Sequence, residues 1–259
     1  MKSQSEKAAG FRALHERARA FIIPNPWDIG TAKMLEALGF EALAGTSAGF
    51  AQSIGKIDGA VDRDTMLAHV AQLAAATDLP LSADLENGYA DKPAGVAETV
   101  RLAAAAGLSG CSIEDLPLGR DGEPYEIAFA AERIRAAAEA AHALPFTFTL
   151  TARAENFIAG HPDLADTIAR LQAFQEAGAD VLYAPGLRTK EDIATVVRSV
   201  DRPVNVLMGL QGVQLNLADL SALGVKRVSV GSALSRVAYN AALSAANEMR
   251  DHGTFTLLS

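Results

Sequence analysis

The 259-residue chain carries 31 acidic and 23 basic side chains, a formal net charge of −8, so it has no excess of lysine and arginine with which to bind phosphates. We therefore expect neither nucleic acid nor an anionic membrane as its main partner. A lone cysteine, Cys111, cannot form a disulfide within the chain, no apolar run approaches the ~20 residues of a membrane span, and residues 1–10 lack the apolar core of a signal peptide, which together predict a cytoplasmic protein.

Short β-rich runs alternate with alanine-rich helical stretches along the chain, a pattern typical of βα units on a parallel sheet. The predicted strands cover residues 21–24, 42–46, 81–86, 110–115, 147–152, 181–184, 204–208 and 227–230. The predicted helices cover residues 29–38, 63–76, 95–106, 127–141, 164–177, 190–200, 217–223 and 233–250.

Several predicted helices end at a glycine that can take the left-handed conformation, and a strand begins a few residues later: Gly39, Gly107, Gly178 and Gly224. No proline-rich linker or charge run divides the chain, so we expect one domain over residues 1–259. An open doubly wound sheet would also alternate, but eight regularly spaced strands favour closure. The fold prediction is an α/β (β/α)₈ barrel, for which the length suffices.

Acidic side chains follow two successive predicted strands. Asp84 and Glu86 are two residues apart, so on a strand they would share a face, and Glu114 would join them from the next parallel strand. Carboxylates that converge without histidine or cysteine repel one another unless a hard cation neutralises them, and oxygen ligands suit Mg²⁺, with Mn²⁺ as a second possibility. The alternative is that they are helix caps or solvated surface acids.

Further candidates follow other strands. Residues 45–49 form a small-residue loop whose N–H groups and hydroxyl could bind a carboxylate or oxyanion, although a plain turn is an alternative. Asp58 could reach the metal through water or simply form a turn. Arg153 ends the fifth strand and needs an anionic partner, either a substrate carboxylate or a neighbouring acid.

Tyr183 and Asn205, on later strands, could line the same pocket or be satisfied polar groups of the core. Cys111 is out of phase with Glu114 and is expected to be a small buried apolar residue. The five histidines fall on helices or loops away from the strand ends, so we assign them no catalytic role: His15, His69, His142, His161 and His252.

With these residues in place, the chain resembles the isocitrate lyase and phosphoenolpyruvate mutase superfamily over nearly its whole length. The matching segments are Pro24-Asn25-Pro26-Trp27-Asp28, Thr46-Ser47-Ala48-Gly49, residues 55–59, residues 83–89, Ser112-Ile113-Glu114-Asp115 and Thr151-Ala152-Arg153. The resemblance implies a barrel whose last helix is exchanged between protomers, usually in a tetramer built from two such dimers.

The resemblance also implies Mg²⁺ held directly by Asp84, with Glu86, Glu114 and Asp58 acting through bound waters. Members of the superfamily cleave or form a C–C or C–P bond beside an α-keto or 2-hydroxy acid through an enolate. In that scheme Ser47, Ala48 and Gly49 would bind the enolate or carboxylate, and Arg153 would hold the carboxylate that does not react.

The loop after the fourth strand departs from the family. Residues 116–124 contain neither the lysine and cysteine of the lyases nor the lysine, asparagine and serine of the phosphonate mutases, which weakens both a thiol-dependent lyase and C–P chemistry. Arg120 or Glu123 on this loop could supply a proton. Gly45 stands where many relatives have an aromatic ring, so we expect a roomier pocket there.

These patterns predict a Mg²⁺-dependent lyase or hydrolase that cleaves a C–C bond of a small carboxylic acid, with an oxaloacetate-like or 2-methylmalate-like substrate. The alternatives are phosphonopyruvate hydrolase or phosphoenolpyruvate mutase chemistry, and a non-catalytic barrel that binds a keto acid.

Overall fold

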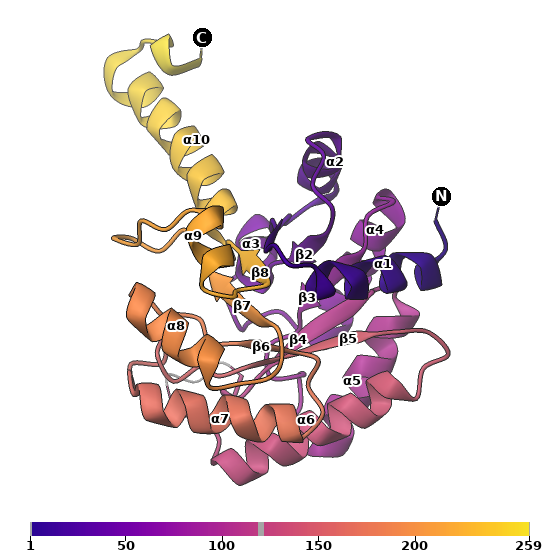
Figure 1. Cartoon of the computed structure of the whole chain (residues 1–259). Coiled ribbons are helices and arrows are strands. Elements are labelled where there is room, and N and C mark those ends of the chain that lie inside the picture. The colour runs from indigo at the N-terminus through magenta and orange to yellow at the C-terminus, as the bar shows by residue number, and fades with distance from the viewer. Residues whose placement is uncertain (1, 119–121, 259) are drawn as a thin grey trace.

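The computed structural model describes residues 2–118 and 122–258, in which eight parallel strands form one sheet in the order β1-β8-β7-β6-β5-β4-β3-β2 (Figure 1). The strands are β1 (Phe21–Ile23), β2 (Leu43–Gly45), β3 (Leu81–Asp84), β4 (Gly110–Glu114), β5 (Thr149–Arg153), β6 (Val181–Tyr183), β7 (Val204–Leu207) and β8 (Arg227–Ser229). The helices are α1 (Gln4–Glu16), α2 (Ile29–Ala37), α3 (Ser47–Ser53), α4 (Arg63–Ala76), α5 (Pro93–Ala105), α6 (Ile127–His142), α7 (Leu164–Glu176), α8 (Lys190–Arg198), α9 (Leu217–Ala222), α10 (Ala233–His252) and the short 3₁₀ helix η1 (Thr256–Leu258).

The strands curl into a nearly closed barrel, which confirms the predicted fold class. Each strand pairs in parallel with its neighbours, and β1 at one end of the order is bound to β8. Where β1 and β2 meet, the Ala44 N–H donates to the Pro24 carbonyl over 3.1 Å. The carboxyl ends of all eight strands therefore open on one side, where barrel enzymes keep their chemistry.

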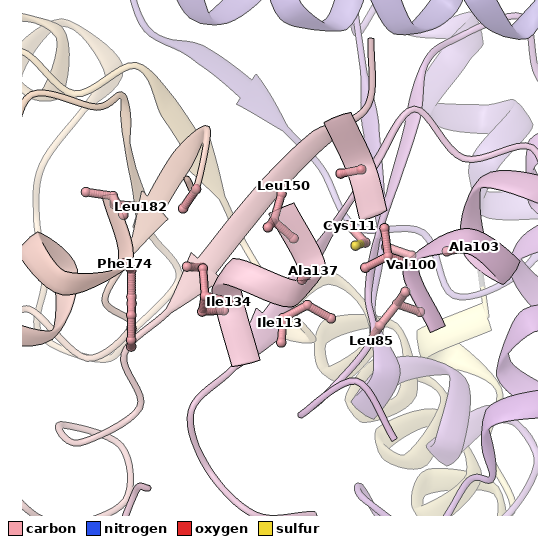
Figure 2. Packing of buried hydrophobic residues seen from close by; sticks show 14 of the residues in the cluster. Leu85, Val100, Ala103, Cys111, Ile113, Ile134, Ala137, Leu150, Phe174 and Leu182 are labelled. Atoms are coloured by element: carbon pink, nitrogen blue, oxygen red, sulfur yellow. The ribbon is translucent and has the colours of Figure 1, made fainter. Parts of the chain in front are cut away.

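The main hydrophobic core fills the space between the strands and the surrounding helices. Leu85, Ile113 and Leu150 from the sheet side pack against Val100 of α5 and Ile134 of α6, all at most 1% exposed (Figure 2). Cys111 lies in this layer and is fully buried, as predicted, and its burial raises the pKa of the thiol. The Cys111 thiol is thus kept neutral and away from the strand ends.

Helix α1 was not predicted, and it packs at the amino-terminal end of the barrel. It begins with a capping box, in which Ser3 and Glu6 satisfy each other's backbone N–H groups. The Phe11 ring lies edge-on to Phe21 at the start of β1, and the Gln4 side chain donates to two carbonyls at the end of α5. Its sequence hides this role, because residues 1–10 are mostly polar and the apolar contacts come later in the helix.

Helix α10 leaves the barrel and projects away from it (Figure 1). Of its 20 residues, Ser235 and Ala245 are buried, whereas Val237 is 68% exposed and Leu243 is 59% exposed. Phe255, Leu257 and Leu258 continue this exposed apolar surface beyond the helix. None of the described helices combines the length and apolar content needed to cross a bilayer.

Candidate active site

A cavity of about 490 Å³ opens at the carboxyl ends of the strands and brings together nearly all the residues that the sequence singled out. Its walls include candidates from most of the strands and from the loops that follow them: Ser47, Ala48, Asp58, Asp84, Glu86, Glu114, Arg153, Tyr183 and Asn205. Gly49 is not part of the wall, and its N–H donates to the Thr46 hydroxyl over 3.3 Å. None of the five histidines lines the cavity, as predicted.

Glu86 reaches the cavity from a strained turn, not from a strand. The predicted strand over residues 81–86 is two residues too long, because β3 ends at Asp84. Beyond it, Glu86 takes a φ of 51° and Tyr89 a φ of 54°, values that non-glycine residues rarely adopt and that cluster at functional sites. The Glu86 carbonyl accepts a 2.8 Å hydrogen bond from the Glu114 N–H, which ties the two acids' backbones together.

Arg153 is the centre of an ion-pair network. Its Nη1 lies 2.6 Å from Asp84 Oδ2 and 2.7 Å from Glu114 Oε1, and its Nε lies 2.8 Å from Glu155 Oε1. Its guanidinium carbon lies 5.0 Å from the centre of the Tyr183 ring. Arg153 itself is 8% exposed, so these are partly desolvated pairs that hold its head group in one place.

Negative charge exceeds positive charge around this network. Burial, followed by the nearby charges of Asp84 and Asp58, raises the pKa of Glu86 to about 8. Burial also raises the pKa of Glu114 well above its ordinary value and that of Glu155 to about 7, although the charge of Arg153 opposes both shifts. One guanidinium therefore does not neutralise the set, and a second cation would be favoured here.

The donor set fits a hard divalent cation that keeps most of its waters. The acids supply oxygen ligands, and Mg²⁺ dehydrates reluctantly and is held by few carboxylates in many enzymes. Within residues 2–118 and 122–258, no three His, Cys, Asp or Glu side chains are already arranged as a set of ligands.

The predicted loop over residues 45–49 is partly helical. Thr46 caps α3, and the N–H groups of Ser47 and Ala48 in its first turn have no carbonyl acceptor within the helix. The Ser47 hydroxyl donates to Asp84 Oδ2 over 3.3 Å, so this hydroxyl faces the acids. Gly45 lines the cavity, and a Cβ there would lie 3.8 Å from Ala83, Leu73 and Val70, so the roomier pocket expected at Gly45 stays a prediction.

Two buried arginines behind the cavity support its loops. Arg133 of α6 is 0% exposed and donates to the carbonyls of Asn87, Ala90 and Asp91 after β3 and to the Glu114 carbonyl at the end of β4. Its guanidinium carbon lies 4.3 Å from the centre of the Tyr125 ring.

Arg170 of α7 lies 3.0 Å from Asp115 Oδ2, while the other Asp115 oxygen accepts from the Glu155 N–H. Asp115 therefore faces away from the cavity and anchors the ends of β4 and β5.

Some wall residues were missed from the sequence. Glu155 follows Arg153 by two residues, and this spacing was the available signal for its placement beside Arg153. Arg227, the first residue of β8, also lines the cavity, and a charged residue within a predicted barrel strand was the available signal for it. Glu123 is exposed and does not line the cavity, while Arg120 lies outside the described residues.

The chain is similar to a known protein family and to characterised relatives. The family model described as phosphoenolpyruvate phosphomutase matches residues 11–250. An oxaloacetate decarboxylase of Paraburkholderia xenovorans is 30% identical over 229 residues, covering 86% of this chain and 74% of the relative.

Two solved structures are similar over almost the whole chain. A crystal structure from Burkholderia cenocepacia J2315, assigned to the broad class of lyases and mutases, is 61% identical with a TM-score of 0.95 and covers 98% of this chain and 91% of its own. A phosphonopyruvate hydrolase in complex with oxalate and Mg²⁺ is 27% identical with a TM-score of 0.86, and the match covers 95% of this chain and 88% of that one.

Proposed function

Because the chain belongs to the phosphoenolpyruvate mutase and isocitrate lyase superfamily, we propose that it is a Mg²⁺-dependent lyase or hydrolase that cleaves a C–C bond beside the keto or hydroxy group of a small carboxylic acid. The observation that carries the proposal is the gathering of Asp84, Glu86 and Glu114 around Arg153 in one cavity at the carboxyl ends of the strands. An oxaloacetate-like or 2-methylmalate-like acid is the leading substrate.

In this proposal Asp84 holds the metal directly, while Glu86, Glu114 and Asp58 bind its waters. When bound, Mg²⁺ supplies the Lewis acid that stabilises an enolate oxygen as its negative charge grows. Ser47 and Ala48 line the same cavity, and their N–H groups in the first turn of α3 would donate to that oxygen or to the adjacent carboxylate.

Arg153 would bind the substrate carboxylate that does not react. Its Nη1 and Nε are engaged by Asp84, Glu114 and Glu155. Nη2 has no ion-pair partner among residues 2–118 and 122–258, so we assign the Nη2 donors to the substrate. The three ion pairs fix the guanidinium before the substrate arrives, which lowers the entropy cost of orienting the acid. Tyr183, beneath the guanidinium, and Asn205 complete the wall.

The activity is tested with purified protein, Mg²⁺, and a panel of oxaloacetate and 2-methylmalate-type acids, by measuring pyruvate or glyoxylate. We expect turnover that chelation of Mg²⁺ abolishes, and Asp84→Ala should abolish it too, because the other acids hold the metal through water. Asp64→Ala, which removes an exposed carboxylate on α4, is the matched control and should retain full activity.

The same panel separates the alternatives. C–P chemistry is supported by the likeness to phosphonopyruvate hydrolase, and it predicts phosphate release from phosphonopyruvate. A barrel that only binds keto acids predicts heat of binding in calorimetry with Mg²⁺ but no product from any substrate. Absence of both turnover and Mg²⁺-dependent binding would contradict the proposal as a whole.

We further propose that α10 is exchanged between protomers and that two such dimers form a tetramer. The exposed apolar residues Val237 and Leu243, continued by Phe255 and Leu257, support this proposal, because a surface of this kind on a projecting helix needs a partner to cover it.

A further inference from the structure

A second guanidinium reaches the cavity from within the barrel. Arg227, the first residue of β8, is 5% exposed and lines the same cavity as Asp84. Its Nε donates to Asn205 Oδ1 over 3.0 Å and its Nη2 donates to the Thr151 hydroxyl over 3.0 Å. Thr151 lies two residues before Arg153 on β5, so this head group lies deeper in the barrel than the Arg153 network.

The third contact of Arg227 is also to a neutral group. Its Nη1 lies 3.4 Å from His15 Nε2, and His15 Nδ1 lies 2.9 Å from the Phe11 carbonyl. A carbonyl can only accept, so the His15 proton belongs on Nδ1 and the Nε2 lone pair faces Arg227. Burial, and then the charge of Arg227, lower the pKa of His15 to about 3, so the ring is uncharged at neutral pH.

Charge compensation differs between the two guanidiniums. Arg153 has three carboxylates within 2.8 Å, whereas none of the carboxylates in the described part of the chain forms an ion pair with Arg227. Burial lowers the pKa of Arg227 to about 10, and repulsion from Arg153 adds to this effect. Buried charges in proteins are normally paired, so a guanidinium with neutral partners beside an open cavity lacks its counter-charge.

The N–H donors of Arg227 are suited to bind a negatively charged group. Within the described residues, Asn205, Thr151 and His15 use three of its five N–H groups. The remaining two are on the terminal nitrogens, which in proteins bind carboxylates. Asn205 and Thr151 fix the plane of the guanidinium in advance. The wall nearby is neutral and polar, since Ser229 accepts from the Asn205 amide over 2.9 Å.

We propose that Arg227, held by Asn205 and Thr151, forms a small-anion site inside the barrel that takes one carboxylate group or one halide ion. The anion has two possible sources, namely the second carboxylate of the substrate or a free ion from solution. The substrate case rests on the proposed function, whereas the site itself requires no turnover.

Crystals of the wild-type protein soaked in sodium bromide test the site directly. We expect a bromine anomalous peak within hydrogen-bond distance of the Arg227 terminal nitrogens. A parallel soak adds succinate, a four-carbon dicarboxylate with no keto group to cleave. Replacement of bromide by a succinate carboxylate identifies the substrate as the source, and bromide that stays identifies a free ion. Water at Arg227 in both soaks, with bromide confined to the surface, would overturn the proposal.

Variants of Arg227 test the same site in solution. The broadening of the chloride NMR signal by the protein should fall in Arg227→Met, with binding at least about tenfold weaker because a charge-assisted hydrogen bond is lost. Arg227→Lys, which keeps the positive charge, should retain part of the broadening. Arg236→Met is the matched control, since Arg236 is an exposed guanidinium on the rim of the same cavity. Equal broadening in wild type and Arg227→Met would contradict the site. If the variant fails to fold, the wild-type soak decides.

Discussion

The buried arginines of this protein differ in role because they contact different kinds of groups. Arg153 is surrounded by carboxylates and orients the candidate active site, Arg133 binds backbone carbonyls and braces two loops, and Arg227 binds neutral side chains and keeps its charge available. Arg153 could be predicted as a site residue because it ends a strand. The role of Arg133 could not be predicted, because the partners of Arg133 lie up to 46 residues away and are backbone carbonyls, which every residue has.

At the same scale, His15 makes stability depend on pH. Its pKa falls from 6.5 to about 3 in the folded protein, chiefly through burial. Below pH 6.5 the unfolded chain binds a proton on His15 that the folded protein does not bind until about pH 3, so the free energy of unfolding falls as the pH falls through this window. His15→Gln should flatten this dependence by up to about 1.4 kcal/mol per pH unit.

Urea unfolding at a series of pH values measures the effect. His161→Gln, which changes an exposed histidine, is the control and should keep the wild-type slope. A slope unchanged in His15→Gln would show that the buried ring does not carry this linkage.

At the scale of elements, much of the barrel follows from local pattern. The α4 prediction matched at both ends, and every strand was found within two residues of its predicted bounds, because apolar runs and terminal glycines mark these elements locally. The turn at Glu86 was missed because Glu86 is left-handed without being a glycine, although Gly88 in the same turn is also left-handed. Asp84 and Glu114 were placed correctly because parallel strands end at the same side, but the contacts across the barrel required the three-dimensional structure.

The Arg133 brace predicts coupling between α6 and the turn after β3. Arg133→Met removes the Arg133 donors from the carbonyls of Asn87, Ala90, Asp91 and Glu114, and should cost about 2–4 kcal/mol of unfolding free energy. We expect faster amide hydrogen exchange in residues 87–91, measured by mass spectrometry. Arg135→Met, an exposed arginine of the same helix, should change neither quantity. Unchanged exchange in Arg133→Met would show that the turn holds its shape without the brace.

At the scale of the whole molecule, the barrel is complete without α10, and the exposed apolar residues of that helix have no partner within the described chain that covers them. A lysine there would place a charge in the proposed interface, where burying it is costly. We expect Leu243→Lys to shift the protein from the oligomer towards the monomer, as measured by light scattering after size exclusion.

Glu139→Lys, which changes an exposed residue of α6 to the same side chain, is the matched control and should leave the mass unchanged. A wild-type protein that is monomeric at high concentration would contradict the exchange of α10.

The contact between β1 and β2 is the least hydrogen-bonded part of the barrel. No ladder connects these two strands in residues 2–118 and 122–258, although the Ala44 N–H reaches across to Pro24, whose own nitrogen has no hydrogen to return. Local opening begins where the fewest backbone bonds must break. The barrel should therefore open locally between β1 and β2, while β1 stays paired with β8. We expect a protease to cleave the chain first at this opening.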